Sequence, residues 1–133
     1  MDVRPVAATV KTPAQNFTGD VYMTPIYRGT DPSRMSVSLV RFTPGAHTNW
    51  HRHAVGQTLH VTDGVGLIQS RGGPVTVIRP GDVIYTPPGE WHWHGGCPEN
   101  FMVHTAIWEG VDSDRPETEW GDHVTDAEYV VPE

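Results

Sequence analysis

Four features are scarce in this sequence, and each scarcity excludes a class of protein. The one cysteine, Cys97, cannot form an internal disulfide. Lysine and arginine number 9 against 16 aspartates and glutamates, and the net charge of -7 argues against a nucleic-acid partner, which requires a basic face. No apolar run is long enough to span a bilayer, and residues 1–4 are not typical of a signal peptide. We therefore expect no nucleic-acid or membrane partner, and a cytoplasmic location.

Glycine and proline are abundant instead, with 14 and 12 residues in a chain of 133. Together with 37% hydrophobic residues, they favour one turn-rich β domain with a single core. Short alternating or apolar runs between turn residues predict strands. These lie at 17–27 (interrupted by Pro25), 36–42, 58–62, 65–70, 75–78, 83–86 and 101–108. Strands this short and regularly spaced indicate an antiparallel sandwich or barrel.

The two ends of the chain lack this pattern. Residues 1–16 are predicted to be an arm that adds an edge strand or crosses to a partner. Residues 112–133 are acidic and are interpreted as a solvated tail. Within this tail, Thr125 and Glu128 have the spacing of a capping box, which predicts one short helical turn. Asp63-Gly64 is a typical hairpin turn and predicts that 58–62 and 65–70 are paired.

Histidines are grouped around one of the turns. His51 and His53 are two residues apart, so an extended chain places both imidazoles on one face. Gln57 has the same parity, and His92 follows the next turn-rich segment. Packed core histidines in a metal-free protein are the alternative interpretation. Three imidazoles and an amide at ligand spacing favour a divalent metal site.

Two spacings match a known family. Gly45-x5-His51-x-His53-x3-Gln57-x6-Gly64 resembles the first motif of the cupin superfamily, and Gly81-x5-Pro87-x-Gly89-x2-His92 resembles the second. The resemblance implies an all-β, single-domain jelly-roll barrel spanning 1–133, with its barrel region at 36–109. It also implies that the metal ligands are His51, His53, Gln57 and His92. The family usually has glutamate where this chain has Gln57. A neutral amide leaves more positive charge on the metal, which favours lyase or isomerase chemistry over redox chemistry with O₂.

Further segments narrow the resemblance. The runs 50–59, 88–94, 102–107 and 122–129 are similar to the bacterial manganese-dependent cupin hydroxynitrile lyases. This implies cleavage of α-hydroxynitriles to an aldehyde and cyanide, and the reverse addition, with Mn²⁺ as cofactor. It implies that His104 is the catalytic base, and that substrate is contacted by Thr48, Ser38, Val40 and Trp108. Trp108 is bulky and is expected to narrow the pocket. His94 shares the parity of His92 and either orients a ligand or is a structural residue.

Several alternatives remain open at the level of sequence. The donor set also suits Fe²⁺, Ni²⁺, Zn²⁺ or Cu²⁺. A dioxygenase or isomerase acting on a small carbonyl or enol compound fits the same scaffold, as does a non-catalytic cupin that binds a small ligand. In each case the partner is a small molecule. We also expect a homo-oligomer, a dimer or tetramer, formed by packing of the sheets.

Overall fold

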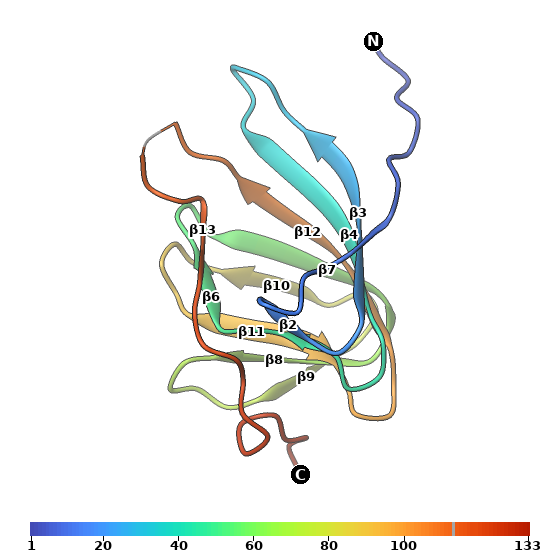
Figure 1. Ribbon diagram of the computed structural model, residues 1–133, viewed down its shortest axis with the longest axis vertical. Coiled ribbons are helices and arrows are strands. Elements are labelled where there is room, and N and C mark those ends of the chain that lie inside the picture. Colours follow the sequence, from blue (N-terminus) through green and yellow to red (C-terminus); the bar gives the residue numbers. More distant parts are fainter. Residues whose placement is uncertain (113) are drawn as a thin grey trace.

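A computed structural model describes residues 1–112 and 114–133. It contains two antiparallel sheets that curl around a common interior, with the amino terminus and the carboxyl terminus at opposite ends (Figure 1). The first sheet has the order β1-β3-β4-β12-β7-β10 and the second has the order β13-β6-β11-β5-β2, with β8 on β11 and β9 on β8. The strands are β1 Val10–Lys11, β2 Phe17–Thr18, β3 Val21–Arg28, β4 Met35–Phe42, β5 His47–Thr48, β6 His51–His53, β7 Gln57–Gly64, β8 Gly66–Ser70, β9 Thr76–Ile78, β10 Val83–Thr86, β11 His92–Gly96, β12 Met102–Glu109 and β13 Thr118–Trp120.

The inner face of the first sheet is built in rows that the strand register defines. Because side chains alternate between the two faces of a strand, every second residue points inward. The innermost row contains Met102, Phe42 and Val21, all almost fully buried. Counting along the strands from this first row, the second row contains His104 and Val40, the third Ala106 and Ser38, and the fourth Trp108 and Ser36. Each of these three rows includes a polar side chain, and together they form one wall of a polar site.

The second sheet is covered on both faces. Its strand β11 is buried throughout, since His92 and His94 face the interior while Trp93 faces a separate cluster. That cluster contains Trp50, Leu67, Trp93, Cys97 and Val124, with Tyr129 packed against it. The carboxyl-terminal segment therefore closes the outside of this sheet. Trp50 and Trp93, which flank the ligand histidines in the sequence, pack in this cluster, where their large side chains exclude water.

One local prediction needs correction. β7 and β8 are not a hairpin, because β7 pairs with β10 and β12 while β8 pairs with β9 and β11. The chain passes from one sheet to the other at Gly64, where the backbone of Phe101 approaches too closely for any Cβ. At the carboxyl end, Thr125 and Glu128 do form the reciprocal bonds of a capping box. The single predicted turn is closed by the Glu128 and Tyr129 backbone N–H groups, which donate to the Thr125 carbonyl oxygen, and the described residues contain no helix longer than this turn.

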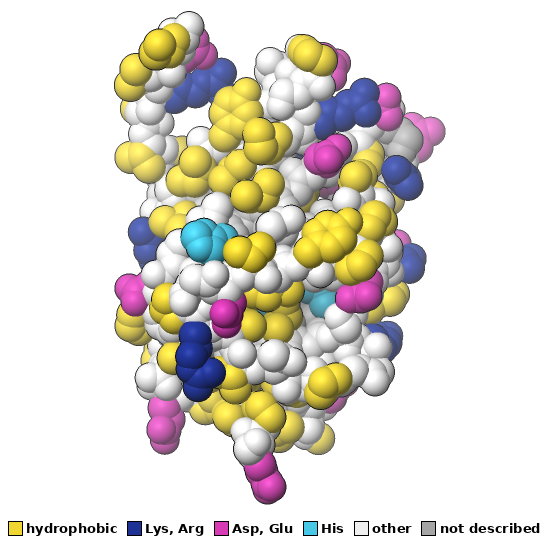
Figure 2. Space-filling model, turned by 180° about the vertical axis from the view of Figure 1, so that it is seen from behind, with side chains coloured by type: hydrophobic (Ala, Val, Ile, Leu, Met, Phe, Trp, Pro, Cys, Tyr) yellow, Lys and Arg dark blue, Asp and Glu magenta, His cyan; other side chains and the backbone are white. Residues whose placement is uncertain are grey.

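Other predictions are confirmed or extended. The site residues that the resemblance implied on β4 and β12 (Ser38, Val40, His104 and Trp108) face the interior, and the amino-terminal arm does add an edge strand, β1, to β3. Among the described residues, no helix has the length and hydropathy that crossing a membrane requires. Charged side chains are scattered between hydrophobic ones over the face shown in Figure 2.

Candidate metal centre and cavity

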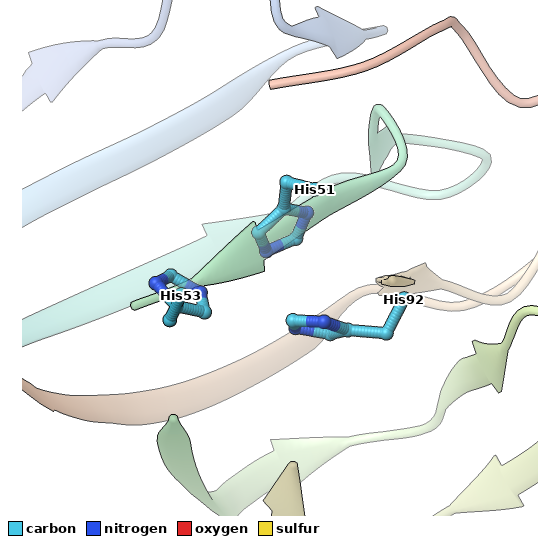
Figure 3. A group of neighbouring side chains, drawn as sticks. All are labelled: His51, His53 and His92. Atoms are coloured by element: carbon cyan, nitrogen blue, oxygen red, sulfur yellow. The ribbon is translucent and has the colours of Figure 1, made fainter. Parts of the chain in front are cut away.

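Three imidazoles converge in the interior. His51 and His53 project from the same face of β6, and His92 reaches toward them from β11 (Figure 3). The strand register pairs His92 directly with His51, and their ring centroids are 4.2 Å apart. One ring nitrogen from each histidine lies within 4.8 Å of the others, and all three residues are buried. The strand pairing, rather than a flexible loop, therefore fixes the geometry of this cluster.

The outer ring nitrogens leave the inner ones available. His51 Nδ1–H donates to the carbonyl oxygen of Asn49 at 2.9 Å, and His92 Nδ1–H donates to that of Glu90 at 3.1 Å. His53 Nδ1 contacts Thr118 Oγ1 at 3.2 Å, while its Nε2 is buried without a hydrogen-bond partner. An imidazole whose Nδ1 carries the proton presents a lone pair at Nε2, as a metal ligand must. The three residues therefore fit a divalent cation.

Burial keeps these rings neutral. Desolvation, together with the neighbouring His92, lowers the pKa of His53 to about 4. The pKa of His51 lies well below its ordinary value for the same reason, with His92 and His53 adding to the effect. Desolvation likewise lowers the pKa of His92. Neutral imidazole is the form that binds metal, so burial keeps the three ligands in the form that can bind it.

Gln57 joins the cluster by a different route from the one its parity suggested. A turn at 54–56 ends β6, and Gln57 is the first residue of β7 in the opposite sheet. Gly56 has a φ of 85°, and a Cβ there would meet the Thr86 carbonyl oxygen. Gln57 Oε1 lies 3.2 Å from His92 Nε2. Since His92 Nδ1 carries the proton, two acceptor atoms face each other there, an arrangement that a cation would relieve.

A cavity of about 420 Å³ adjoins this cluster, with mostly apolar walls. Nine of the ten residues singled out in the sequence line it, and the tenth, His92, is fully buried beside the His51 ring. The structure thus brings together the residues predicted as ligands, base and substrate contacts, while their roles stay predictions. The nine lining residues are Ser38, Val40, Thr48, His51, His53, Gln57, His94, His104 and Trp108.

His104 and His94 form a buried imidazole pair on this wall. His104 Nε2 lies 3.0 Å from His94 Nδ1, so the two nitrogens share one proton. The far nitrogens, His104 Nδ1 and His94 Nε2, are both buried without a hydrogen-bond partner. In either tautomer of the pair, one far nitrogen is a donor and the other an acceptor. Desolvation lowers the pKa of His104 to about 3, so the ring is neutral at physiological pH.

The interpretation of the tail as solvated surface is wrong for part of it. β13 pairs with β6, which places Trp120 opposite His51 and Thr118 opposite His53. The Trp120 ring lies 4.8 Å from the His51 ring and also lines the cavity. Phe17 from β2 lines it too, 5.4 Å from Trp120. Their sequence context offers no signal for this role, because only the pairing of distant strands brings them to the site.

Comparisons with known proteins agree with this architecture. The cupin domain family matches residues 38–105. An (R)-mandelonitrile lyase from Granulicella tundricola is 47% identical over 122 residues, which cover 92% of each chain. A cupin-like protein of known structure from Thermotoga maritima is 37% identical, with a TM-score of 0.82 over 97% of this chain and 95% of that one.

More distant structures support the fold alone. A cupin-2 domain protein from Rhodospirillum rubrum has a TM-score of 0.72 at 17% identity, over 96% of this chain and 82% of the other. The motif spacing, the two curled sheets and the interior cluster of histidines thus occur together in one chain. With the family match and the relative at 47% identity, they show that this chain belongs to the cupin family.

Proposed function

We propose that this protein is a metal-dependent lyase that cleaves α-hydroxynitriles to an aldehyde and hydrogen cyanide. One observation carries the proposal: a neutral, buried imidazole with an unpartnered nitrogen, His104, shares a cavity with a three-histidine cluster of metal-binding type. The similarity to an (R)-mandelonitrile lyase supplies the substrate class. The reverse reaction, addition of cyanide to an aldehyde, follows from microscopic reversibility.

His51, His53, His92 and Gln57 are the residues that would hold the metal, which we propose to be Mn²⁺. When bound, this cation supplies a Lewis acid that polarises the oxygen of the substrate. Gln57 contributes an oxygen without charge, so the ligand set itself is neutral and does not offset the positive charge at the site. The hydrogen bonds to Asn49 and Glu90 hold two of the imidazoles in the orientation that this role requires.

His104 is the proposed base. Its free nitrogen accepts the hydroxyl proton of the substrate as the carbonyl double bond forms. The bond between the carbinol carbon and the nitrile carbon breaks, and its electron pair stays on the cyanide carbon. The proton that His104 accepted is returned to cyanide, so the products are the aldehyde and hydrogen cyanide. His94 contributes by hydrogen bonding to His104 Nε2 and fixing the orientation of the base.

The remaining walls orient the substrate and exclude water. Val40, Ala106 and Phe42 contribute apolar surface on one side of the cavity, and Phe17 and Trp120 on the other. Thr48 is almost fully buried and accepts a hydrogen bond from the His94 backbone N–H at 3.2 Å. Its hydroxyl is thereby oriented as a polar contact for the substrate. Exclusion of water prevents solvent from competing with His104 in the transfer of the substrate proton.

The test combines metal analysis with activity. Elemental mass spectrometry of the purified protein and mandelonitrile cleavage are measured before and after chelation. We expect a stoichiometric divalent metal and benzaldehyde release that chelation removes and Mn²⁺ restores. Bound metal without cleavage would refute the lyase reaction and retain the metal site. Failure to take up any metal on titration would refute the ligand assignment.

A further inference from the structure

A row of side chains crosses the inner face of the first sheet at the edge of the cavity. The register places Gln57 on β7 opposite Trp108 on β12, Trp108 opposite Ser36 on β4, and Ser36 opposite Arg28 on β3. All four residues line the cavity. Trp108 and Gln57 also line a separate groove of about 440 Å³. Residue 108 therefore stands between the cavity and this groove.

One carboxylate, from the carboxyl-terminal segment, joins several members of this row. Arg28 donates from both terminal nitrogens to the two oxygens of Glu117, each at 2.8 Å. The Trp108 indole N–H donates to Glu117 Oε1 at 2.9 Å, and Arg28 also donates to Ser36 Oγ at 2.6 Å. A bidentate arginine–carboxylate pair with a third donor fixes direction as well as distance. Glu117 thus restrains the indole through its only polar atom.

Glu117 links the two sheets. The next residue, Thr118, begins β13 and contacts His53, whereas Arg28 and Trp108 belong to the first sheet. The Trp108 ring centroid lies 6.4 Å from that of His53. The hydrogen bonds from Arg28 lower the pKa of Glu117, so the carboxylate is ionised at neutral pH. Gly110 leaves room for the pair, because a Cβ there would lie 3.1 Å from both Arg28 and Glu117 atoms.

We propose that Glu117 determines the substrate size that the cavity accepts, by holding the Trp108 indole in place as the wall beside His53. This inference rests on the proposed function, since it treats the cavity as the binding site for the aldehyde portion of the substrate. Glu117 touches neither the reacting atoms nor the ligand nitrogens and is a positioning residue. Without it, the indole loses its hydrogen-bond acceptor and can rotate away, which enlarges the cavity on the side of the groove.

The experiment compares two neutral aldehydes of different size. Binding of benzaldehyde and of 2-naphthaldehyde to the purified, metal-containing protein is measured by calorimetry, and cleavage of the two corresponding hydroxynitriles is measured in parallel. We expect the parent protein to prefer the smaller ring. Glu117→Ala should shift the affinity ratio toward the larger ring by roughly tenfold, the discrimination typical of a modest change in pocket shape. Glu117→Gln keeps an acceptor oxygen and should retain most of the preference.

Matched variants separate positioning from general damage. Glu119→Ala removes a nearby ion pair, between Arg52 and Glu119 of β13. Neither residue lines this cavity, so this variant should leave the ratio unchanged. Trp108→Ala should shift the ratio at least as far as Glu117→Ala. In the Trp108→Ala background, Glu117→Ala should then add nothing, because its effect acts through the indole. Metal content is measured for every variant.

The outcomes distinguish this inference from the proposed function. Aldehyde binding with a size limit that Glu117→Ala relaxes would support the inference even if no hydroxynitrile were cleaved. Cleavage by the parent with an unchanged size ratio in Glu117→Ala would overturn the inference and leave the lyase function intact. Additive shifts in the double variant, or an equal shift in Glu119→Ala, would also overturn it. If neither aldehyde binds to the parent protein, the cavity is not the aldehyde-binding site, and the inference is refuted.

Discussion

At the scale of single residues, the site depends on how each imidazole is oriented. His51 and His92 donate their Nδ1 protons to backbone carbonyl oxygens, and His53 contacts a hydroxyl. His94 and His104 instead contact each other. These five histidines therefore divide into three with a lone pair available to a metal and two that share a proton. Their hydrogen-bond partners, not their residue type, separate the two roles.

The role of His104 can be tested by removing its ring. His104→Ala should lower hydroxynitrile cleavage by roughly 10² to 10⁴, the usual contribution of a positioned base, because no other group takes its place. Metal content should stay the same, since His104 lies outside the three-histidine cluster. Steady-state rates and elemental analysis provide the measurement. The exposed histidine of β7 offers a matched control, and His60→Ala should change neither quantity. Loss of metal from His104→Ala would show that the residue is a ligand or a structural support.

At the scale of elements, β13 contributes more than its three residues suggest. It adds an edge to the second sheet beside β6, and it carries Thr118 and Trp120 to the histidines. Its position also brings Glu117 to Arg28 and Trp108. A segment that is acidic and polar in sequence is therefore one wall of the cavity. The acidic and polar composition of this segment therefore did not indicate that part of it faces the cavity.

The contact between β13 and the metal cluster leads to a prediction about affinity. Thr118→Val removes the hydroxyl beside His53 Nδ1 and leaves the side-chain shape nearly unchanged. We expect metal affinity to fall by roughly tenfold or more, because the partners that orient a ligand histidine contribute at this level. Competition with a chelator of known affinity measures it. Thr58→Val, on β7 and outside the cavity lining, is the control and should retain the parent affinity. Equal affinities for all three proteins would contradict the prediction.

At the scale of the whole molecule, several neutral histidines are enclosed in one β barrel. His51, His92, His94 and His104 are at most 4% exposed. The barrel also has an outer face, where Val83 and Tyr85 of β10 are more than half exposed (Figure 2 shows hydrophobic side chains among charges on one face of the molecule). A homo-oligomer that covers such side chains stays a prediction.

Enclosure of neutral histidines predicts that the metal-free protein loses stability in acid. Their folded-state pKa values are lower than the unfolded value of 6.5, so the unfolded chain binds more protons below that pH. The stabilisation is complete above pH 6.5 and decreases as the pH falls to about 4 for His53 and to about 3 for His104. Each group contributes up to about 1.4 kcal/mol per pH unit in its window.

Urea unfolding of chelated protein between pH 7 and pH 4 measures this effect. The midpoint should fall steadily over the range. Added divalent metal should raise the midpoint at pH 7 and lose this effect in acid, because protons compete for the ligands. His60→Ala should show the same pH dependence as the parent, since His60 is exposed. A midpoint independent of pH between 6.5 and 4 would contradict the burial of neutral imidazoles.

The sequence alone determined those features that depend on neighbouring residues. Alternation separated the two faces of each strand, and turn residues located most strand boundaries. The spacing of His51 and His53 placed both on one face of a strand, because side chains repeat every two residues. The family resemblance, carried by the same local motifs, supplied the barrel and the later histidines.

Only the tertiary structure decided how distant segments meet. Asp63-Gly64 has the composition of a hairpin turn, yet β7 and β8 join different sheets, because their pairing partners come from β10, β12, β9 and β11. Gln57 reaches the histidines from the opposite sheet, and Glu117 reaches Arg28 over 89 residues of chain. A period of two residues fixes which face a side chain takes. It carries no information on which strand lies across from it, and packing of the two sheets around one interior settles that choice.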